Sequence, residues 1–307
     1  MENQSRAEAG VTEFIKSMLA KTLDQAGVQL GDPAYVAEAK LDGQRAQIVV
    51  REHRTVACYS RIGRDLLGEK GCAWLKTIQW PVAAARLDGE LYTGQGQNTA
   101  GPDVLHARST AGEALALAVF DLLELSDATG AIQSTMGLPW EDRRKLLETL
   151  FAGVTLPRIS LSPVSADHQA LWQAWVEQMG GEGIMLKHRQ SKWVPGWRSP
   201  YWIKCKREMT VDVLITGVTD KPTYDNGGYR TPGKGWALTY GYIVDGRLVT
   251  VGQGIQFGPM AELEQYVGRV AEVRCNGVMP SGAVRHGRFL RWRPDKQPED
   301  CRLEDKA

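Results

Sequence analysis

The chain has 307 residues, of which 43% are hydrophobic, which is enough for one or two domains with apolar cores and too much for a disordered protein. Its formal net charge is +1, so a surface for nucleic acid has to come from local clusters of basic residues. The five cysteines lack Cys-x-x-Cys and zinc-ligand spacing, and no run of about 18 apolar residues occurs. We therefore expect a cytoplasmic protein with reduced thiols, neither secreted nor membrane-spanning.

The first predicted element is an amphipathic helix over residues 11–23. Apolar side chains recur there at the spacing of one helix face, and Gly27 follows at a position suited to end the helix.

Residues 35–51 form the stretch around which the rest of the chain is organised. Two strand-like runs, 35–40 and 46–51, flank Asp42-Gly43, a pair that predicts a tight β-hairpin. Lys40 then lies at a strand end. An amine held there is a candidate nucleophile once burial or neighbouring cations lower its pKa, whereas the alternative is a solvated surface hairpin.

The next segments predict further strands and one loop. Strands are expected at residues 56–60, 84–92 and 114–123. The first leads into a basic turn at 61–64, and the glycine- and proline-containing segment 94–112 is expected to be a mobile surface loop. The third strand is almost wholly apolar, so Phe120 within it is most simply a core residue.

Two helices and a pair of strands complete the first part of the chain. Proline favours the first turn of a helix at 139–151, and a second helix is expected at 167–179. A strand follows from Glu182 to Lys187. Residues 187–207 are rich in cations and tryptophan, which is typical of contact with a phosphate backbone. Alternation in the strand at 202–206 places Lys204 and Lys206 on one face. An anion between these two lysines would relieve their repulsion.

A boundary is expected near residue 208, because short strands dominate after it. We predict strands at 211–219, 236–244, 247–255, 269–275 and 284–293, with a helix at 259–268 opened by a proline. This order matches an OB-fold, a small β-barrel. Residues 220–235 form a long glycine- and proline-rich loop between the first two strands.

Seven short motifs occur in order along the chain: Lys40-Leu41-Asp42-Gly43-Gln44-Arg45, Ser60-Arg61-Ile62-Gly63, Asp88-Gly89-Glu90, Phe120-Asp121-Leu122-Leu123, Glu182-Gly183-Ile184-Met185-Leu186-Lys187, Trp202-Ile203-Lys204-Cys205-Lys206 and Arg291-Trp292-Arg293-Pro294-Asp295-Lys296. Together they resemble the covalent nucleotidyltransferases, and among these the compact, phage-encoded ATP-dependent DNA ligases. The resemblance covers residues 35–296. It implies an α+β protein of two domains: a nucleotidyltransferase (adenylation) domain of antiparallel sheets with helices at 1–207, and a β-barrel OB-fold domain at 208–307.

The segment 18–21 is similar to one that precedes the lysine motif in many ligases, but its helical spacing leads us to assign it no adenine contact.

The resemblance implies a reaction in three steps. Lys40 attacks the α-phosphorus of ATP to form lysyl-AMP, AMP passes to the 5′-phosphate of a nick, and the 3′-hydroxyl then displaces it. Lys204 and Lys206 resemble the clamp on the α-phosphate, and their charge would lower the pKa of Lys40. Asp42 would orient the reacting groups or a metal ion.

The remaining site residues are expected to bind nucleotide, metal or DNA. Glu90 and Glu182 resemble carboxylates that bind the ribose and a divalent ion, Mg²⁺ or Mn²⁺. Phe120 would stack on adenine, and Arg45 and Arg61 would hold phosphate and sugar. Pyrophosphate departure is assigned to Asp295 and Lys296. DNA contacts are expected from Arg45, Arg61, Lys187, Arg198, Lys221, Arg230 and Lys234.

Alternative functions remain open at this stage. An mRNA-capping guanylyltransferase shares the lysine motif and a terminal OB-fold, and an RNA ligase shares the chemistry. A non-enzymatic single-strand-binding protein would use an OB-fold without the nucleophile. The NAD⁺-dependent ligases are longer and carry zinc modules, so ATP is the expected donor. For a ligase, the partners are ATP and nicked duplex DNA, without a membrane, in a monomer that acts in DNA repair, replication or recombination.

Overall fold

A computed structural model describes residues 14–93, 115–220, 223–224, 230–231, 236–256, 264–278, 281–284 and 287–302, with the backbone alone within 220–236 and 253–256. The chain divides into two compact units, Met1–Lys206 and Arg207–Ala307. No helix in these described ranges has both the length and the apolar character needed to cross a membrane.

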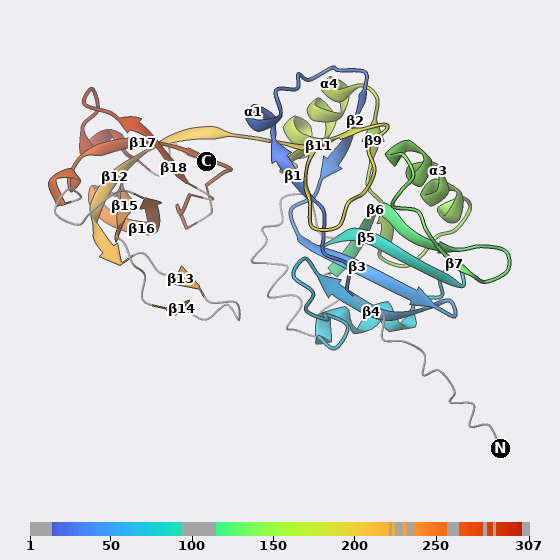
Figure 1. The fold of residues 1–307 in the computed structure, drawn as a ribbon. Coiled ribbons are helices and arrows are strands. Elements are labelled where there is room, and N and C mark those ends of the chain that lie inside the picture. Colours follow the sequence, from blue (N-terminus) through green and yellow to red (C-terminus); the bar gives the residue numbers. More distant parts are fainter. Residues whose placement is uncertain are drawn as a thin grey trace. The chain divides into compact units, whose positions relative to one another are not determined.

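The first sheet of the first unit has the strand order β1-β11-β10-β2-β9. Its strands are β1 (Leu19–Thr22), β2 (Tyr35–Lys40), β9 (Val164–Ser165), β10 (Gly183–His188) and β11 (Arg198–Lys206). β1 is parallel to β11, and the other neighbours are antiparallel. Ala37, Ile184 and Ile203 form a buried cluster with Val176, which belongs to a π-helical segment, Trp172–Gln178, that continues α4 (His168–Leu171). Figure 1 shows α4 beside β2.

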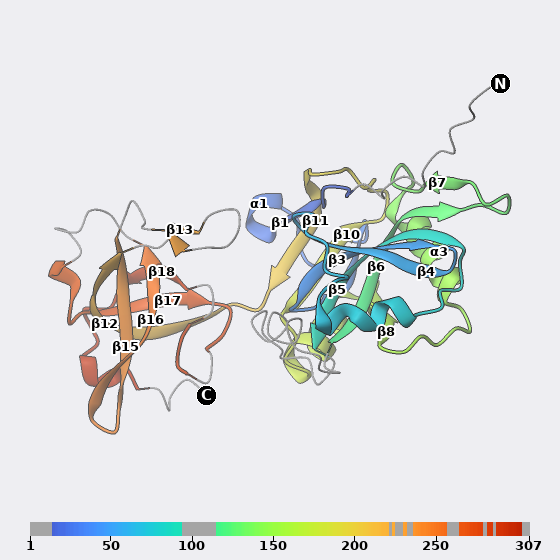
Figure 2. The ribbon, with the colours of Figure 1, turned by 90° about the horizontal axis from the view of Figure 1, so that it is seen from below.

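The second sheet has the order β4-β3-β5-β6-β7, with β8 parallel to β6. Its strands are β3 (Gln44–Arg51), β4 (Arg54–Ser60), β5 (Ala84–Thr93), β6 (Leu115–Ser126), β7 (Ile132–Ser134) and β8 (Ile159–Leu161). Alternate residues such as Ile48, Leu87 and Leu117 fill a core with Trp80 and with Leu147 of α3 (Trp140–Phe151). A 3₁₀ segment, Lys70–Thr77, adds to this core (Figure 2). The predicted strands at 56–60, 84–92 and 114–123 are confirmed.

The predicted hairpin at Asp42-Gly43 is wrong. β2 pairs with β9 and β10, whereas β3 pairs with β4 and β5, so the chain crosses from one sheet to the other immediately after Lys40. Gly43 is required by close packing, because a Cβ atom there would lie 2.1 Å from the carbonyl oxygen of Leu91. A local pattern cannot separate the two cases, since a hairpin and a crossing both place a compact turn between two strands.

The predicted helix at 11–23 is also wrong in its described part. From Phe14 to Met18 the chain is not helical, and Leu19–Thr22 is strand β1. The helix α1 spans only Leu23–Ala26, and it ends as expected at Gly27, whose φ is 66° and whose N–H donates to the carbonyl of Leu23 at 3.1 Å. The apolar spacing of this segment favours a helix, but pairing with β11 outweighs that local preference.

The two later helices of this unit are close to their predictions. α3 begins at Trp140, with Pro139 as its N-cap residue rather than inside the first turn. The segment predicted as a helix at 167–179 consists of α4 and the π-helical segment that follows it. Its N-cap carboxylate, Asp167, accepts the N–H of Ala170 at 2.9 Å. The predicted loop at 94–112 lies outside the described residues.

The second unit contains an antiparallel sheet in the order β16-β15-β12-β17-β18. Its strands are β12 (Met209–Asp220), β15 (Trp236–Val244), β16 (Arg247–Gln256), β17 (Val270–Cys275) and β18 (Arg288–Trp292). Two short strands, β13 (Thr223–Tyr224) and β14 (Arg230–Thr231), pair within the predicted loop. Val213, Leu238 and Tyr242 belong to its apolar core.

The described residues of this unit show neither the predicted closed barrel nor the full predicted helix. Within the described residues, the pairing runs from β16 to β18 without closing, so the sheet is open. The predicted helix at 259–268 falls partly outside the described residues, and the rest contains only the 3₁₀ turn Glu264–Tyr266. Another 3₁₀ turn, Pro298–Asp300, follows the last strand.

Candidate active site

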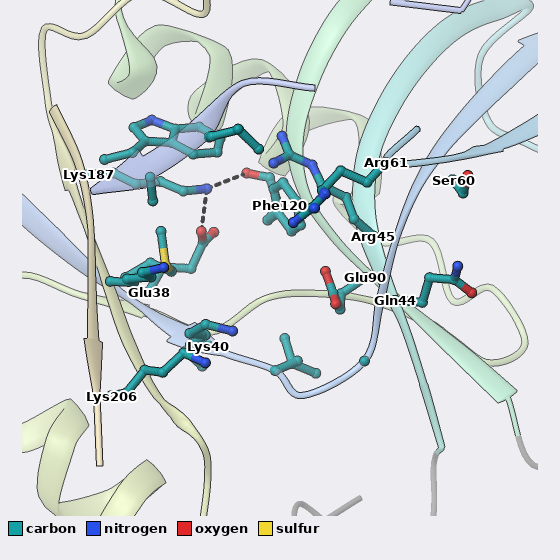
Figure 3. Close-up of a pocket in the computed structure, with 18 of the residues that line it drawn as sticks. Glu38, Lys40, Gln44, Arg45, Ser60, Arg61, Glu90, Phe120, Lys187 and Lys206 are labelled. Atoms are coloured by element: carbon teal, nitrogen blue, oxygen red, sulfur yellow. Dashed lines mark hydrogen bonds and ion pairs between the residues drawn. The ribbon is translucent and has the colours of Figure 1, made fainter. Parts of the chain in front are cut away.

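A pocket of about 680 Å³ lies in the first unit, lined by strands of both sheets. β1, β2, β10 and β11 contribute from the first sheet, and β3, β5, β6 and the loop after β4 contribute from the second. In Figure 3, Lys40 and Lys206 lie on one side of the pocket and Glu90, Arg45 and Arg61 on the other. The crossing between the sheets therefore places the end of β2 inside the pocket.

Two lysines share one carboxylate at the base of this pocket. Gly183, at the start of β10, pairs in register with Lys40 on β2 and with Lys206 on β11, so Glu182 lies between the two amines. One of its oxygens contacts Lys40 Nζ, and the other lies 2.6 Å from Lys206 Nζ. Burial disfavours ionisation of Glu182, but the two ammonium groups outweigh it and lower its pKa. Lys204 also lines the pocket, on the same face of β11 as Lys206, as the sequence predicted.

Glu90 faces this group from β5. Burial raises its pKa to about 8, although Lys40 and Arg45 act in the opposite direction. Arg45 is engaged elsewhere: its Nε donates to Asp88 Oδ1 at 2.9 Å and its Nη1 donates to the carbonyl of Met18 at 2.5 Å. Glu90 is thus a partly buried carboxyl group whose ionised form would be favoured by an additional cation or hydrogen-bond donor.

The divalent metal site predicted at Glu90 and Glu182 fits only in part. Each oxygen of Glu182 already contacts an ammonium group, so a metal ion there would have to share these oxygens with Lys40 and Lys206 or displace one of the two amines. Glu90 does fit, because a cation would favour its ionised form. Within the described ranges, no group of three or more His, Cys, Asp or Glu side chains is placed to hold a metal ion. An ion at Glu90 would therefore need oxygen ligands from a phosphate, as Mg²⁺ commonly has.

The far end of the pocket is aromatic and contains a buried ion pair. Lys187 Nζ contacts Glu38, and it lies 4.3 Å from the ring centroid of Trp202 and 4.6 Å from that of Phe120. Burial lowers the pKa of Lys187, and Glu38 and Asp121 act against this. Its side chain is 1% exposed, which does not fit the DNA contact expected from the sequence. We assign it instead to the wall of the pocket.

Some pocket residues were missed by the sequence analysis. Leu19 and Ala20 line the pocket from β1, in the segment assigned to a helix without a ligand contact. Glu38 lines it because it lies two residues before Lys40 on the same strand and therefore on the same face. That alternation was a signal in the sequence for Glu38. Trp202 had a comparable signal, since it alternates with Lys204 on β11.

Other predicted residues lie at the edge of the pocket or elsewhere. Arg61 and Arg198 line the pocket, and Arg198 Nη1 donates to the carbonyl of Ala20 at 2.8 Å. Asp42 lies in the crossing turn and is not among the lining residues.

The last predicted residues fall in the second unit. Asp295 follows β18 and accepts hydrogen bonds from Arg293 at 2.9 and 2.8 Å, and Lys296 is next to it. Lys221 and Lys234 lie outside the described residues, and Arg230 is described only through its backbone in β14.

Comparison with known proteins points to one family. Residues 17–206 match the family described as ATP dependent DNA ligase domain. The multifunctional non-homologous end joining DNA repair protein LigD of Mycobacterium tuberculosis is 29% identical over 98% of this chain and 41% of its own length. DNA ligase 2 of Haloquadratum walsbyi is 30% identical over 66% of the chain and 34% of its own length. The chain thus spans less than half the length of these relatives.

Solved structures show the same fold. The ligase domain of M. tuberculosis LigD matches with a TM-score of 0.54 and 23% identity, covering 94% of this chain and 97% of that one. A Lig E DNA ligase, studied as a minimal scaffold for DNA binding, matches with a TM-score of 0.58 and 19% identity over 92% of this chain and all of that one. These likenesses extend beyond the first unit into the second.

Proposed function

The chain belongs to the ATP-dependent DNA ligase domain family, and from this premise we propose that it seals nicks in duplex DNA through a covalent lysyl-AMP intermediate. The observation that carries the proposal is the position of Lys40. It ends β2 inside a pocket where two further lysines, Lys204 and Lys206, can balance an α-phosphate, while the partly buried carboxyl group of Glu90 faces it. A surface lysine without a catalytic task would need none of these neighbours.

ATP would occupy the pocket along its length. Its adenine would stack on Phe120 near Trp202, and its ribose would contact Glu90 or Arg61. The α-phosphate would lie at Lys204 and Lys206. An anion there would compete for Lys206 with Glu182, and so would change the surroundings of the amine of Lys40. The amine must lose a proton before its lone pair can attack.

The first step then exchanges one bond for another. The bond from Lys40 Nζ to the α-phosphorus forms, the bond from that phosphorus to the bridging oxygen breaks, and pyrophosphate leaves with the electron pair. The growing negative charge on the phosphoryl oxygens is balanced by the two lysines of β11. Asp42 is proposed to orient the reacting groups in the later steps. A bound Mg²⁺ or Mn²⁺, held by Glu90 and the nucleotide phosphates, would neutralise further phosphate charge.

The two units are proposed to correspond to an adenylation domain and an OB-fold domain, divided near residue 207. The five antiparallel strands of the second unit support this assignment. The five cysteines are buried free thiols, which supports action in a reducing compartment such as the cytoplasm. We propose a monomer whose partners are ATP and nicked duplex DNA.

The test of this function is direct. The protein is incubated with labelled ATP or GTP and then with singly nicked duplexes carrying DNA or RNA on each side of the nick. We expect labelling by ATP and sealing of the DNA nick. Labelling by GTP alone would indicate a capping enzyme, sealing confined to RNA would indicate an RNA ligase, and no covalent adduct at all would indicate a binding protein.

We predict that Asp295→Ala and Lys296→Ala separate the steps of the reaction. These residues are proposed to neutralise the departing pyrophosphate, so reaction with ATP should fall by about a hundredfold, the scale of losing one electrostatic stabiliser. A nick that is adenylated beforehand contains no pyrophosphate, and its sealing should change much less. Rates of both reactions are measured by gel. Arg293 donates a hydrogen bond to the Asp295 carboxylate. Arg293→Lys keeps the cation but changes this contact, and so serves as a control for structural effects of the Asp295 substitution. Equal losses in both assays would assign the pair to DNA binding or stability.

We predict that the segment 220–235 contributes to DNA binding through Lys221, Arg230 and Lys234. A shortened segment should weaken binding to nicked DNA and reduce the slope of affinity against salt concentration, because fewer counterions are released. Titration across a salt series measures this. The matched control replaces the three cations with serine at constant length, and an unchanged salt slope in both variants would contradict the prediction.

A further inference from the structure

The loop after β4 presents one apolar side chain at the mouth of the pocket. Ile62 is 73% exposed, more than any other large apolar side chain in the described part of the chain, and the next, Leu248, is 51% exposed. Ile62 lines the pocket together with Arg61 and Arg64 on either side of it. A single exposed apolar residue is normal on a protein surface, so its position and its support have to carry any further meaning.

The loop that carries Ile62 is held firmly. The N–H of Ser60 donates to the carbonyl of Arg64 at 2.8 Å, and the N–H of Gly63 donates to the carbonyl of Ser60 at 2.9 Å. Gly63 has a φ of 88°, and a Cβ atom there would lie 2.7 Å from the ring of Phe14. The ring of Phe14 in turn contacts Tyr59 at 5.8 Å between centroids. The tip of the loop is therefore fixed in place while its apolar side chain remains in solvent.

We propose that Ile62 is a wedge that inserts at the base step of the nick. This inference rests on the proposed ligase function, because it takes DNA at the pocket mouth as its premise. Arg61 and Arg64 would bind the phosphates on either side of the break, with Arg64 exchanging its ion pair with Glu69, at 2.9 Å, for a phosphate. The apolar side chain between them would contact the exposed base faces. Apolar side chains flanked by cations open base steps in this way in other DNA complexes.

The wedge would make the protein sensitive to the break itself. In a nicked duplex one backbone is cut, so opening the step at the nick costs mainly stacking. In an intact duplex the same opening must also deform both backbones, which costs more. Ile62 would therefore favour nicked over intact DNA before any chemistry occurs. It is a positioning residue, and it does not take part in bond formation.

The test uses 2-aminopurine placed beside the nick, in the absence of ATP, so that the fluorescence rise reports unstacking alone. Wild-type protein should raise the fluorescence with nicked DNA and not with an intact duplex of the same sequence. Ile62→Ser should abolish the rise and weaken nicked-DNA binding about tenfold to a hundredfold, the scale of exposing one isoleucine side chain, while binding to intact duplex is unchanged. Ile62→Leu should retain the rise.

Controls separate this inference from its premise. Ile132→Ser, at a 42% exposed isoleucine on β7 that does not line the pocket, should behave as wild type. Labelling by ATP should be equal in wild type and Ile132→Ser. A rise that persists in Ile62→Ser, equal rises on nicked and intact DNA, or no rise with wild type would overturn the wedge, even if wild type seals nicks. A rise without any sealing would instead overturn the ligase function alone.

Discussion

Replacing Lys40 with alanine is expected to abolish formation of the covalent AMP adduct. No other amine ends β2, and the Lys204 and Lys206 side chains are proposed to bind the phosphate rather than attack it. The fold should persist, because the side chain is 22% exposed and because Glu182 keeps Lys206 as a partner after the change. Labelled ATP and denaturing gels measure the adduct, and circular dichroism checks the fold.

Two further variants make this result specific. Lys40→Arg should fail as completely, since a guanidinium stays protonated and cannot attack. Lys76→Ala, at an exposed lysine outside the pocket, should label normally. Sealing of a nick adenylated beforehand should survive in part in Lys40→Ala, because the last step does not use the nucleophile. An adduct at wild-type level in either Lys40 variant would remove the basis of the proposed mechanism.

Replacing Arg143 with alanine is expected to lower the free energy of unfolding of the first unit by about 3–5 kcal/mol, the cost of leaving a buried charge without its partner. Arg143 and Asp121 are 0% and 1% exposed. Arg143 Nε and Nη2 donate to the two oxygens of Asp121 at 2.7 and 2.9 Å, and its Nη1 donates to the carbonyl of Ser191 at 3.0 Å. The pair thus joins α3, β6 and the turn after β10.

Urea unfolding followed by circular dichroism measures this loss. Since the chain has two units, the transitions are fitted separately. The double variant Arg143→Met with Asp121→Leu should recover much of the stability, because it removes both charges. Lys145→Ala, on the same helix but 71% exposed, should have little effect despite its ion pair with Asp142. A loss below about 1 kcal/mol in Arg143→Ala would show that Asp121 finds other partners.

The Asp121 pair also predicts a pH dependence. Burial alone would raise the pKa of Asp121, but Arg143 outweighs burial and lowers it in the folded state. A carboxyl whose pKa is lower when folded stabilises the protein above its unfolded pKa, and this stabilisation is lost as the pH falls through the folded pKa. The Arg143→Ala variant should therefore lose less stability than wild type on acidification in the range below about pH 4.

The strands that line the pocket could largely be predicted from the sequence. Period-2 alternation indicated that Lys204 and Lys206 share a face, and the strands carrying Glu90 and Phe120 were identified by their apolar runs. The partners of β2 could not be predicted, because Asp42-Gly43 satisfies a hairpin and a sheet crossing equally well. The strand β1 was missed for a related reason: its extended conformation depends on β11, which lies at the other end of the unit.

The side-chain environment was harder to predict than the strands. Lys187 was assigned to DNA because it belongs to a cation-rich segment, but it lies within β10, where its side chain is buried against Glu38. Its partner, Glu38, is far away in sequence, so charge clustering along the chain gave no information on burial. The sheet of the second unit, whose described strands do not close into a barrel, illustrates the same limit, since strand order alone does not determine whether a sheet closes.

The crossing after Lys40 also has a consequence for how the protein folds. β3 pairs with β4 and β5, which follow soon after it in the sequence. In contrast, β2 pairs with β10 and β1 pairs with β11, which are synthesised much later. During synthesis the second sheet can therefore assemble early, while the first sheet cannot close until residue 206 has left the ribosome. Contacts of such long sequence separation form slowly. The nascent chain thus carries Lys40 without Lys204 and Lys206 beside it, and the proposed reaction with nucleotide requires that the whole unit be present.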